Sequence, residues 1–191
     1  MTRSIQSLWV SSASIESTRD NPRAEFAEIY DQQFDFVFET VRRLGCAVSD
    51  REDLVHEVFL RVHAGLDNFD ATRPLRPWLF GIAFRVVSEQ RRSGRSRFEV
   101  AARDWDSPSP VASPEADAIA RDARAKVELA LQRLNVEQRE VFVAHELCEV
   151  PVSELVGVLH IPLNTLYSRL RLARAAFETA LDDILGRKEE S

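Results

Sequence analysis

The chain has 191 residues, of which 45% are hydrophobic and 29% charged, and its formal net charge is −6. This composition excludes an intrinsically disordered chain and fits one medium-sized domain or two small ones. Only six glycines and few alternating apolar runs predict an all-α fold. No apolar run reaches the roughly 18 residues of a membrane span, and residues 1–24 lack the pattern of a signal peptide. We therefore expect a cytoplasmic protein without membrane insertion.

The first 23 residues form an N-terminal extension that carries Ile5, Leu8, Trp9 and Val10, for which the sequence suggests no definite role. From Ala24 to Leu44, apolar residues recur three and four positions apart, which predicts an amphipathic helix that ends at Gly45. The expected buried face consists of Phe26, Tyr30, Phe34, Val37, Val41 and Leu44.

Residues 25–72 form an acidic block with eleven acidic and four basic residues. Ser49 and Glu52 have the spacing of a capping box, which predicts that a second helix begins here. The apolar face of this helix leaves four charged side chains exposed, namely Asp50, Asp53, Glu57 and Arg61. Favourable interaction with the helix dipole accounts for acids in the first turn but not for Glu57. The acidic surface therefore predicts a basic partner.

A basic block follows directly, with seven basic and two acidic residues between positions 73 and 99. Pro77 is well placed in the first turn of a third helix, whose Trp78 and Leu79 face the core. The side of this helix that faces away from the core is expected to carry Arg76, Phe80, Phe84, Arg85, Ser88, Arg91 and Arg92. Aromatic rings among cations suit unpaired bases, which stack on rings while arginines hold phosphates. Packing of Phe80 and Phe84 against the first helix is the alternative.

Residues 99–119 are expected to form a flexible linker, because three prolines between positions 108 and 114 forbid regular structure. The linker divides the chain into two small helical domains, residues 24–98 and 120–186.

The C-terminal domain ends in a predicted helix-turn-helix. A short amphipathic helix over 151–159 is followed by a break at His160, Ile161 and Pro162 and by a longer helix. In the longer helix, a buried stripe is expected from Leu163, Leu166, Leu170, Ala173 and Phe177. Asn164, Ser168 and Arg171 project from the opposite side, where they could read the major groove of DNA. An ordinary helical hairpin with solvated arginines is the alternative, and a left-handed residue at His160 is costly for a side chain other than glycine or asparagine.

No metal, cofactor or catalytic centre is expected. Cys46 and Cys148 are far apart and lack a C-x-x-C partner, so they are predicted to be buried thiols. The pairs His56-Glu57 and His145-Glu146 fail the H-E-x-x-H pattern, because the second histidine is replaced by Leu60 and Glu149.

Three segments in order resemble the extracytoplasmic-function (ECF) sigma factors, the bacterial subunits that direct RNA polymerase to promoters. Residues 52–61 read EDLVHEVFLR and resemble the family's polymerase-binding part of region two. Residues 76–83 read RPWLFGIA and resemble the segment that melts and reads the minus-10 element. Residues 131–142 and 161–174 resemble region four, which reads the minus-35 element.

The resemblance implies three sets of contacts. Core polymerase would bind Asp50, Asp53, Glu57 and Arg61 through a basic coiled coil. The single-stranded minus-10 element would run along Arg76, Phe80, Phe84, Arg85, Ser88, Arg91 and Arg92. At the minus-35 element, base edges would be read by Asn164, Ser168 and Arg171, and phosphates would be held by Arg139, Thr165, Tyr167 and Arg174. An anti-sigma factor would be a further partner.

Four residues depart from the family's usual pattern, namely His56, Arg85, Asn135 and Asn164, and they leave the promoter sequence open. A helix-turn-helix repressor or a response-regulator output domain is the alternative function. It would leave the acidic helix and the Trp78 helix as an unidentified sensor.

Overall fold

The computed structural model describes residues 22–93 and 114–189, and the part of the chain that it describes contains helices and no strand. The predicted all-α fold is confirmed. In chain order the elements are α1 (Pro22–Arg43), η2 (Val48–Asp50), α2 (Arg51–Gly65), η3 (Leu66–Asn68), α3 (Leu75–Arg92), α4 (Pro114–Gln132), α5 (Val136–Phe142), the π-helical η4 (Val143–Leu147), α6 (Val152–Leu159) and α7 (Leu163–Glu189). Among these described elements, none is long and apolar enough to cross a membrane.

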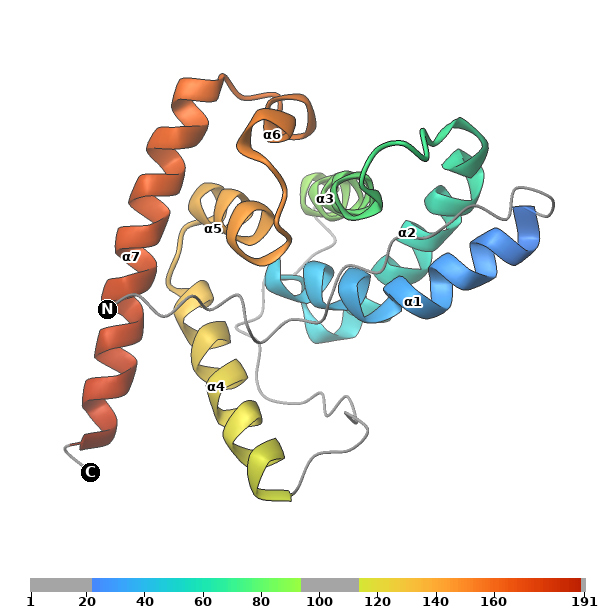
Figure 1. The fold of residues 1–191 in the computed structure, drawn as a ribbon. Helices are drawn as coiled ribbons and strands as arrows, with labels where there is room; N and C mark the ends of the chain where they lie inside the picture. The colour runs from blue at the N-terminus through green and yellow to red at the C-terminus, as the bar shows by residue number, and fades with distance from the viewer. Residues whose placement is uncertain (1–21, 94–113, 190–191) are drawn as a thin grey trace.

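Helices α1, α2 and α3 pack together as the N-terminal half of the molecule (Figure 1). The predicted face of α1 is buried most fully toward its C-terminal end, where Val37, Val41 and Leu44 are shielded from solvent. Toward its N-terminal end the face carries aromatic rings, and there Tyr30 remains 39% exposed. Gly45 follows α1 with a φ of +91°, a conformation that strains residues other than glycine, and the Arg139 guanidinium lies close beside it.

The start of α2 differs from the predicted capping box. Asp50 is the N-cap residue and no side chain caps the helix, because Ser49 donates its hydroxyl hydrogen bond to Asp50 Oδ1 at 2.9 Å. A short 3₁₀ turn, η2, leads into the helix and takes Ser49 out of capping position. The neighbouring Arg51 is buried and donates from Nε to the Cys46 carbonyl at 3.3 Å.

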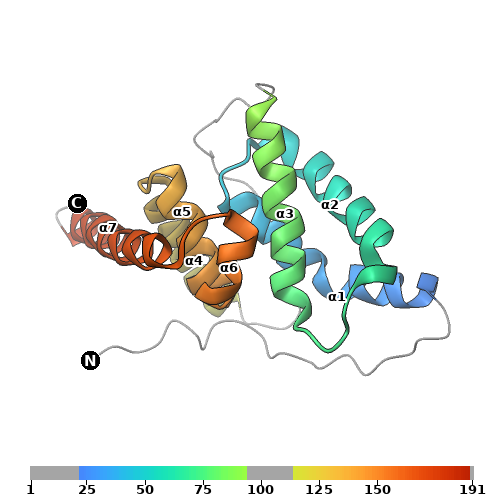
Figure 2. The same cartoon turned by 90° about the horizontal axis from the view of Figure 1, so that it is seen from above.

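Helices α4 to α7 form the C-terminal half, in which α7 packs against α4, α5 and α6 (Figure 2). A complete capping box stands at α5, where the Asn135 side chain accepts from Gln138 N at 2.8 Å and the Gln138 side chain accepts from Asn135 N. Asn135, one of the four departures from the family pattern, therefore caps the N-terminus of α5. His160 adopts the left-handed conformation, with φ 55° and ψ 41°, and terminates α6.

The expected end of the linker is corrected. The linker was expected to extend to residue 119, but α4 already begins at Pro114, since proline is well accommodated in a first helical turn. The rest of the expected linker, up to residue 113, lies outside the described residues, as does most of the N-terminal extension. The second helix of the helix-turn-helix runs from Leu163 to Glu189.

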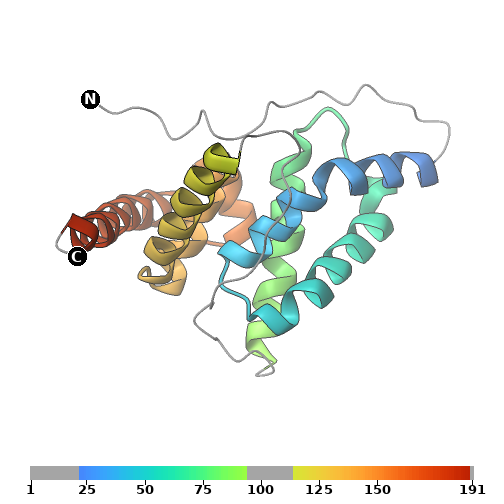
Figure 3. The ribbon, with the colours of Figure 1, turned by 90° about the horizontal axis from the view of Figure 1, so that it is seen from below.

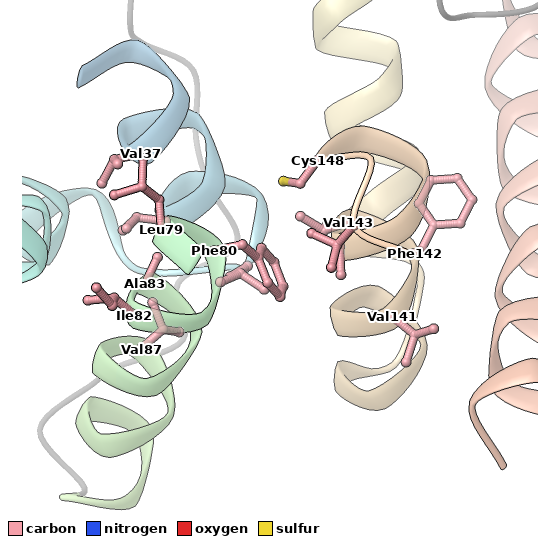
Figure 4. Close-up of a cluster of buried hydrophobic side chains, with 14 of the residues drawn as sticks. Val37, Leu79, Phe80, Ile82, Ala83, Val87, Val141, Phe142, Val143 and Cys148 are labelled. Atoms are coloured by element: carbon pink, nitrogen blue, oxygen red, sulfur yellow. The ribbon is translucent and has the colours of Figure 1, made fainter. Parts of the chain in front are cut away.

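The two halves share one continuous apolar core. In the views from above and below, α3 lies beside α6 and the end of α1 lies beside α4 (Figures 2 and 3). Val158 of α6 packs against Gly81 of α3. Figure 4 shows Phe80 pointing from α3 toward Val143 and Cys148, whereas Leu79 lies near Val37 of α1 and Ile82 points away from the C-terminal half. Packing between the halves therefore decides which parts of the predicted sites are exposed.

Candidate polymerase-binding and nucleic-acid interfaces

The acidic surface of α2 contains exposed carboxylates in its first turn and a charge network further along the helix. Asp53 is exposed in the first turn. One turn later, Arg61 Nε donates to Glu57 Oε1 at 2.7 Å, and its Nη2 donates to Glu89 Oε2 on α3 at 2.7 Å. The hydrogen bonds to Glu89 and Glu57 raise the pKa of the Arg61 guanidinium, and the same bond to Arg61 lowers the pKa of Glu89. Glu57 and Arg61 thus hold α2 to α3, while Asp53 is presented to solvent.

Asp50 is placed differently from the other predicted polymerase contacts. It lies half-buried at the junction of η2 and α2, with one carboxylate oxygen bonded to Ser49 and the other enclosed. Its side chain is therefore less available than that of Asp53.

Helix α3 presents one exposed face that carries cations. Arg85, Ser88 and Arg92 follow one another at spacings of three and four residues, so they lie in one strip. Arg85 and Arg92 are exposed, and each guanidinium donates to the carbonyl one turn earlier, from Arg85 Nε to Gly81 O at 3.0 Å and from Arg92 Nε to Ser88 O at 3.2 Å. Arg76, in the first turn, lies with Cζ 5.1 Å from the centre of the Phe36 ring.

The prediction that Phe80 lies on the exposed side of α3 is wrong. Phe80 is fully buried, and its ring stacks on that of the half-buried Phe84 with centroids 6.3 Å apart. Residues 80, 84 and 91 lie about a quarter of a turn around the helix from the strip of residues 85, 88 and 92. That quarter turn places them against the C-terminal half, which the sequence pattern did not reveal.

Arg91 is also directed inward, contrary to the expectation of an exposed cation. Its guanidinium donates to the Leu44 carbonyl at the end of α1 and forms an ion pair with Glu140 of α5. Burial raises the pKa of the Glu140 carboxyl, although Arg91 opposes that effect. In this arrangement Arg91 joins the two halves and cannot simultaneously contact a phosphate.

Arg139, expected at a DNA phosphate, instead caps the end of α4. Its Nε donates to the Leu131 carbonyl at 2.9 Å, and Nη2 donates to the carbonyls of Gln132 and Leu134 at 3.1 and 3.2 Å. Helix C-termini leave such carbonyls without intrahelical partners, and a guanidinium satisfies several of them at once. Burial lowers the pKa of Arg139.

The side chains of α7 that were predicted to read DNA are exposed along its outer edge. Asn164, Thr165, Ser168 and Arg171 are exposed, as is Tyr167. Ser168 donates to the Asn164 carbonyl at 3.0 Å, and Arg174 donates from Nε to Glu146 Oε1 at 2.7 Å while remaining half exposed. Leu166, Leu170, Ala173 and Phe177 are buried as expected. Leu163 departs from the expected stripe, at 40% exposed, because it begins the helix beyond the edge of the core.

A buried charge cluster between the halves was not predicted. Arg42 pairs with Glu39 within α1 and with Glu128 of α4 across the boundary. Burial raises the pKa of Glu128, with Arg42 opposing, and lowers the pKa of Arg43 and Arg51. Because charges on amphipathic helices ordinarily face solvent, their spacing contained no signal for this contact.

Both cysteines are buried thiols, as predicted. Burial raises the pKa of Cys46 and of Cys148 to about 11. Cys148 lies at the boundary of the halves, with its Sγ 3.5 Å from Thr40 Oγ1 of α1. Within the described residues, His, Cys, Asp and Glu side chains form no group that could hold a metal ion.

Together the fold and these surfaces define an all-helical transcription factor with a helix-turn-helix at its C-terminal end. The sequence comparisons sharpen this class. Residues 29–97 match the model of "Sigma-70 region 2", and residues 124–177 match "Sigma-70, region 4". The first match covers the half that a repressor would have left unexplained.

Relatives match over most of the chain. The ECF RNA polymerase sigma factor SigC of Mycobacterium tuberculosis is 30% identical over 181 residues, covering 93% of this chain and 95% of that protein. SigW of Bacillus subtilis is 24% identical over 179 residues, covering 89% and 96%. The chain belongs to the ECF family of RNA polymerase sigma factors.

Two solved structures share the fold. CnrH in complex with the cytosolic domain of CnrY superimposes with a TM-score of 0.59 at 26% identity, covering 86% of this chain and 91% of that chain. The sigma factor RpoE of Bartonella quintana, in complex with the anti-sigma factor NepR, superimposes with a TM-score of 0.62 at 20% identity, covering 83% and 97%.

Proposed function

We propose that this ECF sigma factor binds core RNA polymerase through α2, opens promoters along α3 and reads the minus-35 element with α7. The carrying observation is the exposed edge formed by Asn164, Ser168 and Arg171 on the second helix of the helix-turn-helix, in a chain that also matches sigma region 2. The protein acts in the cytoplasm as an initiation factor and not as an enzyme. Residues 24–98 and 120–186 act as its two functional parts.

Among the α2 residues, Asp53 makes the main electrostatic contact with a basic surface of the polymerase. Its exposure supports this assignment, whereas Arg61 is bonded to both Glu57 and Glu89. The same surface also includes Asp50, Glu57 and Arg61, whose side chains are less exposed than that of Asp53.

On α3, single-stranded DNA contacts Arg85, Ser88 and Arg92, with Arg76 and Phe84 at the margin. Phe80 is a packing residue. Arg91 becomes available to a phosphate only after its contacts with Leu44 and Glu140 are released. On α7, Thr165, Tyr167 and Arg174 hold phosphates beside the base-reading residues.

An anti-sigma factor controls this protein in the proposal. The support is structural similarity to the sigma factor RpoE, which was solved with the anti-sigma factor NepR, and to CnrH, which was solved with the cytosolic domain of CnrY. Such a partner would bind the same surfaces that polymerase and promoter use.

Reversing the charge of Asp53 tests polymerase binding. We expect Asp53→Arg to lower affinity for core polymerase by about tenfold or more, because a cation replaces an anion facing a basic surface. Binding is measured by gel-shift titration of labelled sigma with core enzyme, and the fold is checked by circular dichroism. Asp182→Arg, an equally exposed position on α7, is the control and should bind normally. Unchanged affinity of Asp53→Arg would contradict the assignment of α2.

A further inference from the structure

An aromatic groove lies on the surface between α1 and α2. It has a volume of about 240 Å³ and is lined by Tyr30, Phe34, Phe38, Glu52, Val55, His56 and Phe59. The Tyr30 and Phe59 ring centroids are 4.6 Å apart, and the Phe34 ring is parallel to that of Phe59 at 6.2 Å. These rings build a largely apolar floor with one carboxylate, Glu52, at its rim.

The groove is open to solvent at its upper edge. Tyr30 is 39% exposed although it continues the face that is buried further along α1, and Phe34 is half-buried, whereas Phe38, Val55 and Phe59 lie buried beneath them. A groove with accessible aromatic side chains can bind apolar side chains.

The N-terminal extension carries a matching segment. Ile5, Leu8 and Trp9 are spaced three and four residues apart, so a helical turn would place them on one face. Residues 1–15 contain a single charged side chain, that of Arg3, and its positive charge is complementary to the negative charge of Glu52. The segment thus offers apolar side chains for the floor and a cation for the rim.

The length of the intervening chain suits this contact. Twelve residues lie between Trp9 and Pro22, and a flexible chain of that length has a typical end-to-end distance of about 20 Å. Tyr30 and Phe38 lie 8 and 16 residues into α1 from Pro22, roughly 12 and 24 Å along the helix axis. Such a tether holds the segment at an effective concentration on the order of millimolar, so weak intrinsic affinity is sufficient.

We propose that residues 5–10 bind in the α1–α2 groove, with the Trp9 ring against Tyr30 and Phe34. Glu52 and His56, which line the groove, directly precede Asp53 and Glu57 in α2. The bound segment therefore covers part of the helix assigned to core polymerase and competes with it. This consequence rests on the proposed function, whereas the intramolecular contact does not.

Fluorine NMR of the full chain tests the contact directly. The three tryptophans are labelled with 5-fluorotryptophan, and Trp9→Phe identifies the Trp9 resonance. We expect this resonance to differ from that of a synthetic peptide of residues 1–21. Tyr30→Lys should move it to the peptide position. The control is Tyr167→Lys, which changes the other tyrosine of the chain, on α7, and should leave the Trp9 resonance in place.

Two outcomes of this measurement overturn the proposal. One is a Trp9 resonance that coincides with the peptide in the unmodified protein. The other is a shifted resonance that does not respond to Tyr30→Lys, which would place the segment elsewhere.

Competition is tested with core polymerase. Deletion of residues 2–15 should raise affinity for core enzyme at least about twofold, the factor expected when the segment occupies the groove half of the time. Unchanged or lower affinity after deletion overturns the competition. The proposal also fails if Trp9 is solvated in the unmodified protein and Tyr30→Lys weakens core binding. In that case the groove is a contact site for the polymerase. A full chain that does not bind core enzyme at all would refute the proposed function instead, and the NMR result would still stand.

Discussion

Two arginines on α7 differ in what surrounds them, and this difference predicts different roles. Arg171 is exposed, while Arg174 pairs with Glu146. We expect Arg171→Ala to cost about 1–3 kcal/mol of holoenzyme binding and to relax preference at one or two minus-35 positions, because a base-edge donor is lost. Binding is measured by competition among promoters that vary in the minus-35 element.

Arg174→Ala is the matched control for that experiment. As a phosphate contact it should weaken binding to all promoters alike and reduce the slope of log affinity against log salt by about 0.9. If Arg171→Ala also lowers affinity uniformly across sequences, then Arg171 contacts phosphate and the base-reading assignment is incorrect.

At the scale of one element, the exposed strip of α3 and its buried face toward the C-terminal half lie a quarter turn apart around the helix. Arg85 and Arg92 lie on the exposed strip, whereas Phe80 is in the core. We expect Arg85→Ala with Arg92→Ala to leave closed-complex formation nearly intact and to suppress permanganate reactivity of thymines near the start site, since these cations meet the strand only after it separates. Wild-type reactivity in the double variant would mean that the strip is ordinary solvated charge.

Phe80→Ala, the complementary change in α3, should act on stability. Removing a fully buried phenylalanine typically costs about 3–5 kcal/mol. We expect a lowered midpoint in urea for this variant and a midpoint near wild type for the arginine double variant. If the Phe80→Ala protein is as stable as the wild type but cannot melt promoters, then Phe80 contacts the DNA strand and is not a packing residue.

At the scale of the whole molecule, the two halves are joined by polar contacts across their boundary. Arg91 pairs with Glu140 across the boundary, and Cys148 lies beside Thr40 there. With a pKa of about 11, only about 0.1% of this thiol is ionised at pH 8, so alkylation should be slow while the halves are packed.

Glu140→Lys should separate the halves and increase the alkylation rate of Cys148 several-fold, because it sets two cations against each other. The rate is followed by peptide mass spectrometry with iodoacetamide at pH 8. Glu137→Lys is the control, since Glu137 is on the same helix and pairs with Arg169 inside the C-terminal half. Equal rates in both variants would show that the Arg91–Glu140 pair does not hold the boundary closed.

Much of this protein was determined by local sequence alone. Helical periodicity located α1, α2 and α3 and the helix-turn-helix within a few residues, because each helix buries a stripe that its own spacing defines. The family followed from three short segments in order. The exposed edge of α7 was also predictable, since Leu166 and Leu170 fix which side faces inward.

Only the tertiary structure decided where charged and aromatic residues on the remaining sides would lie. Phe80, Arg91 and Arg139 have the pattern of a nucleic-acid surface, yet they are covered by packing between two halves that are far apart in sequence. Helical periodicity specifies one buried stripe per helix, and α3 has a second, facing the C-terminal half. That second stripe depends on long-range packing, which spacing within one helix does not encode.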